Sequence, residues 1–281
     1  MTSASPFRIE GPAVISFSGG RTSAYMLRRI LDEGLQPDVH VLFANTGKER
    51  PETLDFVHEC QTRWGVPVRW LERHHGQGDV PSFTEVTYAT ASRQGEPFAA
   101  LLRERGFPPN PIMRFCTTEL KVRVMKTFML AQGYEHWTNV VGLRADEPGR
   151  VANGRATEGK ERWDLAYPLF DAGIRKDDVI LWWKKQPHDL QLRSWEGNCD
   201  LCFLKGQSKR LRIMEDRPDL AEWWIARERD LGASFRVDTP TYAALLHQAQ
   251  YQGRFFSNDL FNEQLPDDPT DLGDCVCLEA A

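Results

Sequence analysis

Buried-strand and helix-like patterns alternate along the first third of the chain. Residues 13–18 (AVISFS) and 40–45 (HVLFAN) are mostly apolar and rich in β-forming side chains, as buried strands are. Between them, residues 23–34 place apolar side chains close to one helical face before a glycine ends the segment. A second helix-like segment at 49–65 leads to a third strand pattern at 66–72. This order predicts parallel strands joined by right-handed helical crossovers.

The alternation breaks at residues 74–115, where glycine, proline and short polar runs surround one helix-like run, EPFAALLRERG. We expect this segment to be an excursion that covers a site. The pattern then resumes as a helix, a strand, a polar loop, a turn with an amphipathic helix and further helices, at residues 117–134, 137–144, 145–164, 166–186 and 207–250.

The predicted fold class is α/β, with a parallel twisted sheet and flanking helices. We predict one α/β domain at residues 1–206, with residues 74–115 as a loop-rich insertion. A mainly helical C-terminal extension with a cysteine-bearing tail is predicted at residues 207–281.

Composition narrows the classes of function without choosing among them. The chain has 281 residues, of which 41% are hydrophobic and 27% charged, and its formal net charge is -5. This charge argues against a protein that coats nucleic acid by bulk electrostatics, but it leaves room for a local basic site. The N-terminus lacks the pattern of a secretory signal, and no run approaches the ~20 apolar residues of a membrane helix. We therefore expect a cytoplasmic protein without a membrane partner.

The loop after the first strand pattern has the chemistry of an anion site. Glycines after a strand let successive amides point at one place, and a helix that begins there adds the positive end of its dipole. Hydroxyl side chains supply further donors, and phosphate is the expected occupant. The alternative is a tight strand-to-helix turn that a Ser or Thr caps. The candidate residues are Ser18, Gly19, Gly20, Arg21, Thr22 and Ser23.

The six cysteines point to thiol or metal chemistry, since disulfides are rare in a reducing compartment. Cys199 and Cys202 form a C-x-x-C turn that could hold one metal ion or one corner of a cluster. Such a pair usually needs further ligands, and Cys116 opens a predicted helix well upstream. Buried thiols without a metal are the alternative.

Six segments, in chain order, resemble one family. They are SFSGGRTS, ANTGKERPET, RFCTTELK, VVGLRADEPGR, YPLFDAGIRKDDVILWW and GNCDLCFLKG, between about residue 13 and residue 206. As an ordered set they resemble the iron–sulfur type of the phosphoadenosine phosphosulfate (PAPS) reductase family, within the adenine nucleotide α-hydrolase-like (PP-loop) superfamily. The resemblance implies a Rossmann-like nucleotide-binding domain and a role in sulfur metabolism.

The resemblance also implies which residues bind the adenine nucleotide. Asn45 and Thr46 could bond a base or ribose, although an ordinary strand-to-helix turn explains them as well. Arg144 and Arg150 could clamp sulfate or phosphate through paired donors, or belong to an exposed ion-paired loop. Together with the loop at Ser18–Ser23, the implied nucleotide-binding residues are Asn45, Thr46, Gly47, Lys121, Gly142, Arg144, Asp146 and Arg150.

A [4Fe-4S] cluster follows from the same resemblance, with Cys116, Cys199 and Cys202 as ligands. The sequence departs from the family pattern because Phe115, rather than a second cysteine, precedes Cys116. The fourth ligand is therefore open, and a tail cysteine or an exchangeable ligand could complete the site. Zinc is the alternative metal, since three or four thiolates also suit it.

The function that the resemblance implies is reduction of the sulfonyl group of PAPS or adenosine phosphosulfate to sulfite. A tail thiol, Cys277 or Cys275, would attack the sulfur, and a thioredoxin- or glutaredoxin-type dithiol would release sulfite. The tail reads GDCVCLE, with acidic neighbours and no histidine, so neither thiol looks activated in isolation. A homo-oligomer is compatible with this assignment.

Two other functions remain open from sequence. The same fold could bind ATP with Mg²⁺, split its α–β bond and deliver sulfur to a nucleic acid or a small molecule with help from a cluster. The chain could also be a non-catalytic nucleotide sensor or partner subunit, for which the altered tail chemistry is the support.

Overall fold

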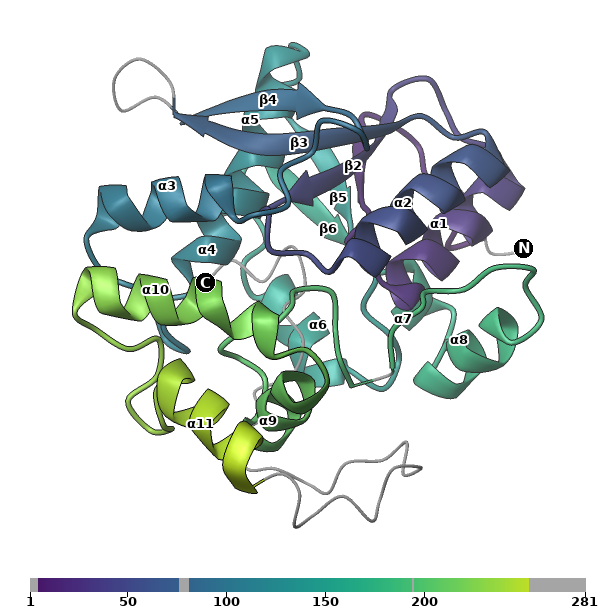
Figure 1. Cartoon of the computed structure of the whole chain (residues 1–281). Coiled ribbons are helices and arrows are strands. Elements are labelled where there is room, and N and C mark those ends of the chain that lie inside the picture. The colour runs from purple at the N-terminus through teal and green to yellow at the C-terminus, as the bar shows by residue number, and fades with distance from the viewer. Residues whose placement is uncertain (1–4, 76–80, 194, 253–281) are drawn as a thin grey trace.

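The structure is a computed structural model that describes residues 5–75, 81–193 and 195–252. Its centre is a six-stranded sheet in the order β4-β3-β2-β1-β5-β6 (Figure 1). The antiparallel pairing of β4 with β3 is the exception to a parallel arrangement. The strands are β1 (Ala13–Ser16), β2 (Val39–Asn45), β3 (Val68–His75), β4 (Pro81–Val86), β5 (Trp137–Val140) and β6 (Trp163–Ala166).

Helices join the strands and continue beyond the sheet. The helices up to residue 131 are α1 (Arg21–Glu33), α2 (Pro51–Trp64), α3 (Glu96–Arg105), α4 (Phe115–Thr117), the π-helical turn η1 (Thr118–Val122) and α5 (Arg123–Ala131). The later ones are α6 (Pro148–Arg155), α7 (Pro168–Asp171), α8 (Lys176–Trp183), α9 (Gln207–Asp216), the 3₁₀ turn η2 (Pro218–Leu220), α10 (Ala221–Leu231) and α11 (Tyr242–Gln252).

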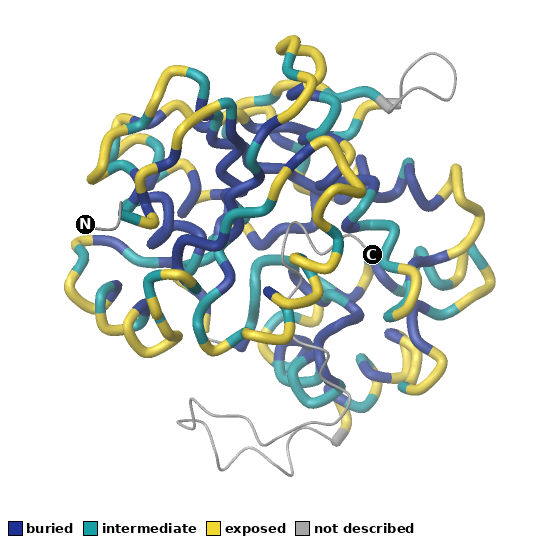
Figure 2. Tube along the Cα trace, turned by 180° about the vertical axis from the view of Figure 1, so that it is seen from behind, coloured by how far each residue is buried: buried dark blue, intermediate teal, exposed yellow. Residues whose placement is uncertain are grey.

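The sheet buries both of its faces, which explains the continuous apolar runs of its strands. In β1, Ile15 packs with α1, α2 and α8 on one face, whereas Val14 packs with α5 on the other. The neighbouring strand alternates in the same way, with Phe43 on the first face and Leu42 on the second. Figure 2 shows the buried residues gathered along the sheet and the inward sides of the helices, with exposed residues at turns and outer helix faces.

A further apolar cluster lies beside the sheet and joins the C-terminal helices to the rest of the molecule. It contains Phe98 of α3, Leu120 of η1, Phe203 of the C-x-x-C segment, Trp224 of α10 and Leu245 of α11. In Figure 1 the helices α9, α10 and α11 lie together below the sheet, near α3 and α4. The predicted domain boundary at residue 206 stays a prediction.

The order of the strands creates a switch point next to β1. From β1 the chain moves outward through β2 and β3, and it later returns to the other side of β1 through β5 and β6. The loops after β1 and β5 therefore diverge over opposite sides of the sheet. Ligands in open α/β sheets bind at the carboxyl ends of strands at such a point, and the Ser18–Ser23 loop lies there.

The α/β class and the first three strands with their helices are confirmed. Two predictions were wrong. The excursion at residues 74–115 contains the edge strand β4, and the predicted polar loop at 145–164 contains α6 and the start of β6. Both strands lie at the edges of the sheet and include charged residues, Glu85 in β4 and Asp164 in β6, so they carry weaker apolar patterns than the central ones. Within the described residues, no helix has the length and apolar character needed to cross a membrane.

Candidate functional site

The loop between β1 and α1 is held as a compact turn by its own polar groups. The Ser18 and Ser23 hydroxyl oxygens lie 3.0 Å apart, and Ser23 Oγ donates to the Gly20 carbonyl at 3.0 Å. Gly19 has φ +77°, a conformation that side-chain-bearing residues rarely adopt. The first turn of α1 contains no acidic residue. The positive end of the helix and its first amides therefore face no competing carboxylate of that turn.

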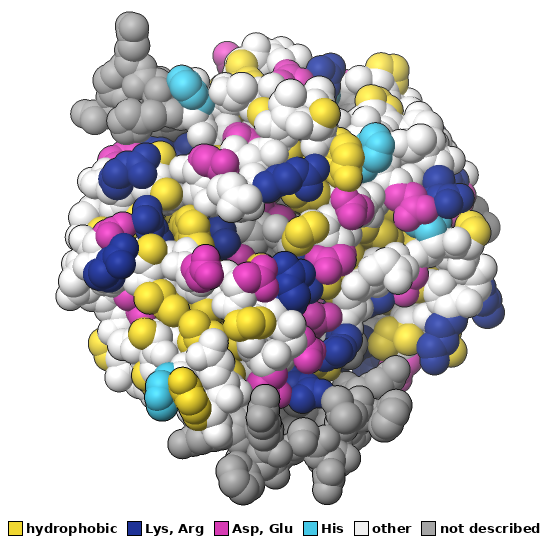
Figure 3. Space-filling view, viewed as in Figure 1, with side chains coloured by type: hydrophobic (Ala, Val, Ile, Leu, Met, Phe, Trp, Pro, Cys, Tyr) yellow, Lys and Arg dark blue, Asp and Glu magenta, His cyan; other side chains and the backbone are white. Residues whose placement is uncertain are grey.

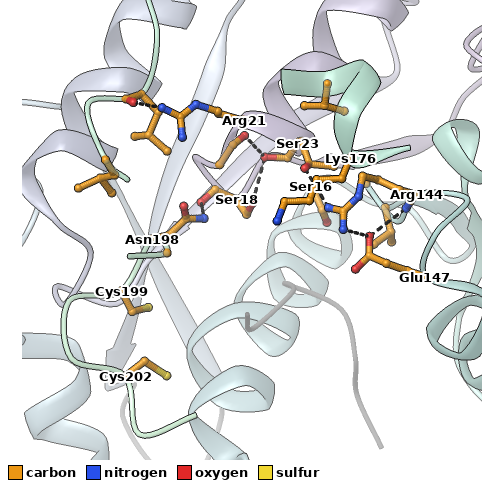
Figure 4. Close-up of a pocket in the computed structure, with 18 of the residues that line it drawn as sticks. Ser16, Ser18, Arg21, Ser23, Arg144, Glu147, Lys176, Asn198, Cys199 and Cys202 are labelled. Carbon is orange, nitrogen blue, oxygen red and sulfur yellow. Dashed lines mark hydrogen bonds and ion pairs between the residues drawn. The ribbon is translucent and has the colours of Figure 1, made fainter. Parts of the chain in front are cut away.

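A cavity of about 380 Å³ opens at this loop, a size in the usual range for small-ligand sites. Figure 4 shows the loop at one end of the cavity, Arg144 and Lys176 at its side, and Cys199 and Cys202 at the other end beyond Asn198. Basic side chains dominate its charged lining. They are Arg21, Lys121, Arg144, Arg150, Lys176, Arg193 and Lys205, against the single carboxylate of Glu147.

The Glu147 carboxylate forms ion pairs with Arg144 and Arg150, the two arginines predicted to clamp an anion. Its carboxylate lies 3.2 Å from Arg144 Nη2 and 2.5 Å from Arg150 Nη1, and it accepts the Arg144 amide at 3.1 Å. Arg144 also donates to the Thr22 hydroxyl at 3.2 Å, which links this loop to the start of α1. Glu147 thus holds both guanidinium groups at the cavity wall, where a phosphate or sulfate would compete with it.

Replacement of Glu147 by Gln is expected to tighten anion binding. The substitution keeps the shape of the side chain and removes the charge that competes for Arg144 and Arg150, so the affinity for inorganic phosphate should rise about fivefold, or ~1 kcal/mol. Calorimetric titration measures the change. The exposed Glu158→Gln carries the same change in net charge and should bind phosphate as the parent does; an equal rise in both variants would contradict the competition.

The thiol end of the cavity is built by the C-x-x-C segment and the turn η1. Lys121, on η1, is buried, and its Nζ lies 3.8 Å from the carboxylate of buried Glu49. The Cys199 thiol donates to the same carboxylate at 3.8 Å, and Lys205 Nζ donates to the Cys199 carbonyl. Burial raises the pKa of the Cys199 thiol well above its usual value; Lys121 lowers that pKa, and Glu49 raises it further. Cys199 is therefore a poor nucleophile in this state.

Most of the predicted binding residues border the cavity. They are Ser18, Gly20, Arg21, Thr22, Ser23, Lys121, Gly142, Arg144 and Arg150, together with the thiols of Cys199 and Cys202. Arg21 is at the wall, but Asp189 engages its guanidinium through bonds of 2.7 and 2.9 Å. Gly19 turns the backbone behind the loop, packed against Thr53 and Val57.

Three of the predicted nucleotide-binding residues, which follow one another at the end of β2, are not among those that line the cavity. Asn45 is fully buried and donates to Glu72 at 2.6 Å and to the Ser92 carbonyl at 2.9 Å, so it joins β2 to β3 and to the loop between β4 and α3. The Thr46 hydroxyl is 2.8 Å from Glu49, and the Gly47 amide donates to Asn45 Oδ1 at 3.1 Å. In this conformation their polar groups stabilise the loop after β2, and their contact with a nucleotide stays a prediction.

Asp146 and Cys116 also lie outside the lining. Burial opposes the ionisation of Asp146, but the hydrogen bond and charge of Arg144 outweigh it, and the pKa of this carboxyl is lowered. It orients Arg144, whose Nε donates to it at 3.1 Å. Cys116 packs against the same apolar cluster as Cys202. Cys275 and Cys277 lie outside the described residues.

Sequence reasoning missed several lining residues, chiefly Ser16, Glu147, Lys176, Arg193 and Asn198. Glu147 and Asn198 lie within two of the segments that carry the family resemblance, VVGLRADEPGR and GNCDLCFLKG, so the sequence did contain a signal for them. Lys176 begins α8 after the Pro-Leu turn, and nothing in its local pattern separates it from a surface lysine.

The residues that the structure describes do not form a complete metal site. Cys199 and Cys202 border the same cavity, and no group of three or more His, Cys, Asp or Glu within the described ranges is arranged to hold a metal ion. A cluster or a structural zinc needs three or four protein ligands. This part of the chain therefore does not fit a [4Fe-4S] cluster on its own.

Two curated proteins of uncharacterized function are similar to the chain. The nin region protein ORF290 of Escherichia phage lambda is 33% identical over 204 residues, 70% of this chain and 67% of that protein. Protein MJ0066 of Methanocaldococcus jannaschii is 25% identical over 223 residues, and the match spans 77% of this chain but only 41% of MJ0066.

Solved structures show a weaker likeness. A PAPS reductase from Candida auris in complex with phosphate aligns with 65% of this chain and 80% of its own, with 13% identity and a TM-score of 0.41. The U34-tRNA thiolase NcsA from Methanococcus maripaludis, determined with its [4Fe-4S] cluster, aligns with 91% of this chain and 76% of its own, with 13% identity and a TM-score of 0.39.

The family itself is shown by sequence. The family model described as "Phosphoadenosine phosphosulfate reductase domain" matches residues 12–186, more than half of the chain. This range begins just before β1 and runs through α8, so it includes the loop at Ser18–Ser23 and the arginine loop after β5. The chain belongs to the phosphoadenosine phosphosulfate reductase domain family.

Proposed function

We propose that this protein is an enzyme that binds a sulfonucleotide at the Ser18–Ser23 loop and reduces its sulfonyl group to sulfite. The observation that carries the proposal is the cavity itself, which joins an anion-binding loop, a basic wall and two thiols. The family assignment supports the same class of substrate. An adenylate phosphate would lie on the first amides of α1, where no acidic side chain of that turn competes with it.

The chemistry requires a thiolate, a leaving nucleotide and a reductant. A thiolate of Cys277 or Cys275 would attack the sulfonyl sulfur, the bond from sulfur to the phosphate oxygen would break, and the nucleotide would leave with that electron pair. A dithiol protein of the thioredoxin or glutaredoxin class would then reduce the cysteine–sulfonate bond, which releases sulfite and leaves the dithiol oxidised to a disulfide.

The basic wall would serve this reaction in two ways. Arg144 and Arg150 would hold anionic groups of the substrate through charge-assisted hydrogen bonds once these displace Glu147. Lys121 and Lys205, at the thiol end, would attract the negatively charged sulfonate. Their positive charges would also offset the negative charges of the acidic residues beside the tail thiols. The [4Fe-4S] cluster stays a prediction, and none of these steps depends on it.

A second candidate is an ATP-dependent sulfur transfer, favoured by the position of Cys199 and Cys202 in the same cavity as the loop. With Mg²⁺, ATP would be split at its α–β bond to activate an acceptor. The groove next to the cavity has four basic and four acidic residues in its lining. Because these charges are balanced, the groove does not favour a nucleic acid as that acceptor. On the face shown in Figure 3, basic and acidic side chains are likewise interspersed. The groove residues are Arg21, Arg50, Arg193, Arg217, Glu52, Asp189, Glu196 and Asp216.

A turnover comparison separates the two candidates. PAPS, adenosine phosphosulfate and ATP are offered to anaerobically purified protein with a thioredoxin-type reductant, and sulfite and pyrophosphate are measured. We expect sulfite from a sulfonucleotide. Pyrophosphate from ATP without sulfite would contradict the first proposal and favour the second.

The tail thiols can be tested one at a time. Cys277→Ser should abolish sulfite release, because an alcohol does not attack the sulfonyl sulfur, while nucleotide affinity stays within about twofold since the loop is untouched. Cys275→Ser is the matched control and should retain turnover. The reverse pattern would assign the nucleophile to Cys275, whereas parental rates in both variants would contradict a tail nucleophile.

A further inference from the structure

The C-x-x-C segment is joined to the loop between β2 and α2 by an isolated backbone bridge. Cys199 bridges Glu49 in antiparallel fashion. The Arg50 amide donates to the Asn198 carbonyl at 2.8 Å, and the Asp200 amide donates to the Lys48 carbonyl at 2.9 Å. These contacts anchor residues 198–200 to the loop that precedes α2.

The side chain of Asn198 reaches from this fixed segment to the anion-binding loop. Its Nδ2 donates to the Ser18 carbonyl at 2.9 Å. A Cβ on Gly20 would lie 3.2 Å from both amide atoms of Asn198, so the amide also packs against the residue that precedes α1. Figure 4 shows Asn198 between Ser18 and Cys199 at the cavity wall.

The contact with Ser18 makes Asn198 sensitive to the conformation of the loop. The Ser18 carbonyl and the Gly19 amide belong to one planar peptide unit, so any rotation of that amide toward a bound anion also turns the carbonyl. The acceptor of Asn198 would then move while its backbone stays paired with Arg50. The strain would pass to the adjacent residue, Cys199.

We propose that Asn198 is a positioning residue that couples occupancy of the Ser18–Ser23 loop by a nucleotide to the placement of the thiol segment Cys199–Cys202. This inference rests on the proposed nucleotide binding at the loop. It gives the enzyme a means of arranging its thiol end only when substrate is present. Coupling of this kind requires one contact that both sites share, and the bond from Asn198 to Ser18 is such a contact.

Hydrogen–deuterium exchange of the full-length protein tests the coupling without any need for turnover. Exchange is followed with and without saturating adenosine 3′,5′-bisphosphate and, in parallel, a non-hydrolysable ATP analogue. In the parent protein, nucleotide should slow the exchange of peptides covering residues 17–24. It should speed the exchange of peptides covering residues 197–205, because the bond from Asn198 to Ser18 is then strained. The change in 197–205 should be about two- to tenfold, the size expected for one hydrogen bond.

Asn198→Ala removes the donor and keeps the backbone pairing, so residues 17–24 should still respond to nucleotide while residues 197–205 should not. Asn198→Leu keeps a similar size without the donor and without adding charge, and it should behave in the same way. The exposed Asn153→Ala is the matched control and should respond as the parent does at both segments.

Two results would overturn the inference for different reasons. A response of residues 197–205 that persists in both Asn198 variants would contradict the coupling alone, because the nucleotide would then be acting on the thiol segment directly. Unchanged exchange of residues 17–24 in the parent protein with either nucleotide would contradict nucleotide binding at the loop, and the coupling with it.

Discussion

Gly19→Ala is expected to weaken nucleotide binding by about two orders of magnitude, because binding depends on the exact path of one turn and on charge-assisted bonds from its amides. At φ +77° an alanine is strained by about 1–2 kcal/mol. Its Cβ would also lie 2.7 Å from Thr53 Cγ2 and 2.9 Å from Val57 Cγ2, both on α2. The loop must then move away from α2, which turns its amides away from the anion.

Gly65→Ala separates the backbone penalty from the steric one. Gly65 ends α2 with φ +61°, and a Cβ there would meet nothing within 4 Å. Gly65→Ala should therefore cost the folded state a similar backbone strain energy, while the nucleotide affinity measured by calorimetry stays parental. If Gly19→Ala also binds nucleotide at parental affinity while folded, the assignment of the loop is wrong.

Asp200→Ala is expected to lower the free energy of unfolding by about 3–5 kcal/mol, the usual cost of breaking a buried ion pair. Asp200 Oδ2 lies 2.6 Å from Lys48 Nζ, and the two side chains are only 4% and 9% exposed. Its other oxygen accepts the Trp224 indole N–H at 2.9 Å and the Leu201 amide at 2.6 Å. The substitution thus leaves a buried cation and two buried donors without this acceptor.

Urea denaturation measures this loss, and two further variants check its cause. Asp216→Ala breaks an exposed pair, in which Asp216 lies 2.7 Å from Arg193, and should cost less than about 1 kcal/mol. Lys48→Met combined with Asp200→Ala should recover part of the loss, because no buried charge is then left over. Equal small effects of Asp200→Ala and Asp216→Ala would contradict the role of the buried pair.

The central strands and the glycine turn after β1 were predictable because their signals are local. Both faces of β1 and β2 are buried, so their apolar runs are continuous, and the glycine turn follows directly in the chain. The edge strands β4 and β6 were missed because strands at the margin of a sheet need less apolar surface, and their apolar patterns are interrupted by charged residues.

The parts of the site that escaped prediction depend on contacts between distant segments. Arg21 pairs with Asp189, 168 positions away, so its side chain supports the wall rather than pointing freely into the cavity. Asn198 bonds to Ser18 over a separation of 180 residues. Asn45 and Thr46 had the right residue types for a ligand contact, but neighbouring carboxylates take up those groups, which only the packing of the loop reveals.

A crystal structure with bound PAPS shows whether the amides at the start of α1 hold the oxyanions of an adenine nucleotide. We expect phosphate oxygens within about 3 Å of the amides of residues 20–23. We also expect Arg144 to turn from Glu147 to the nucleotide and the sulfonate to point toward Cys199 and Cys202. A nucleotide bound elsewhere, with the Ser18–Ser23 loop unchanged and Glu147 still holding both arginines, would contradict nucleotide binding at this loop.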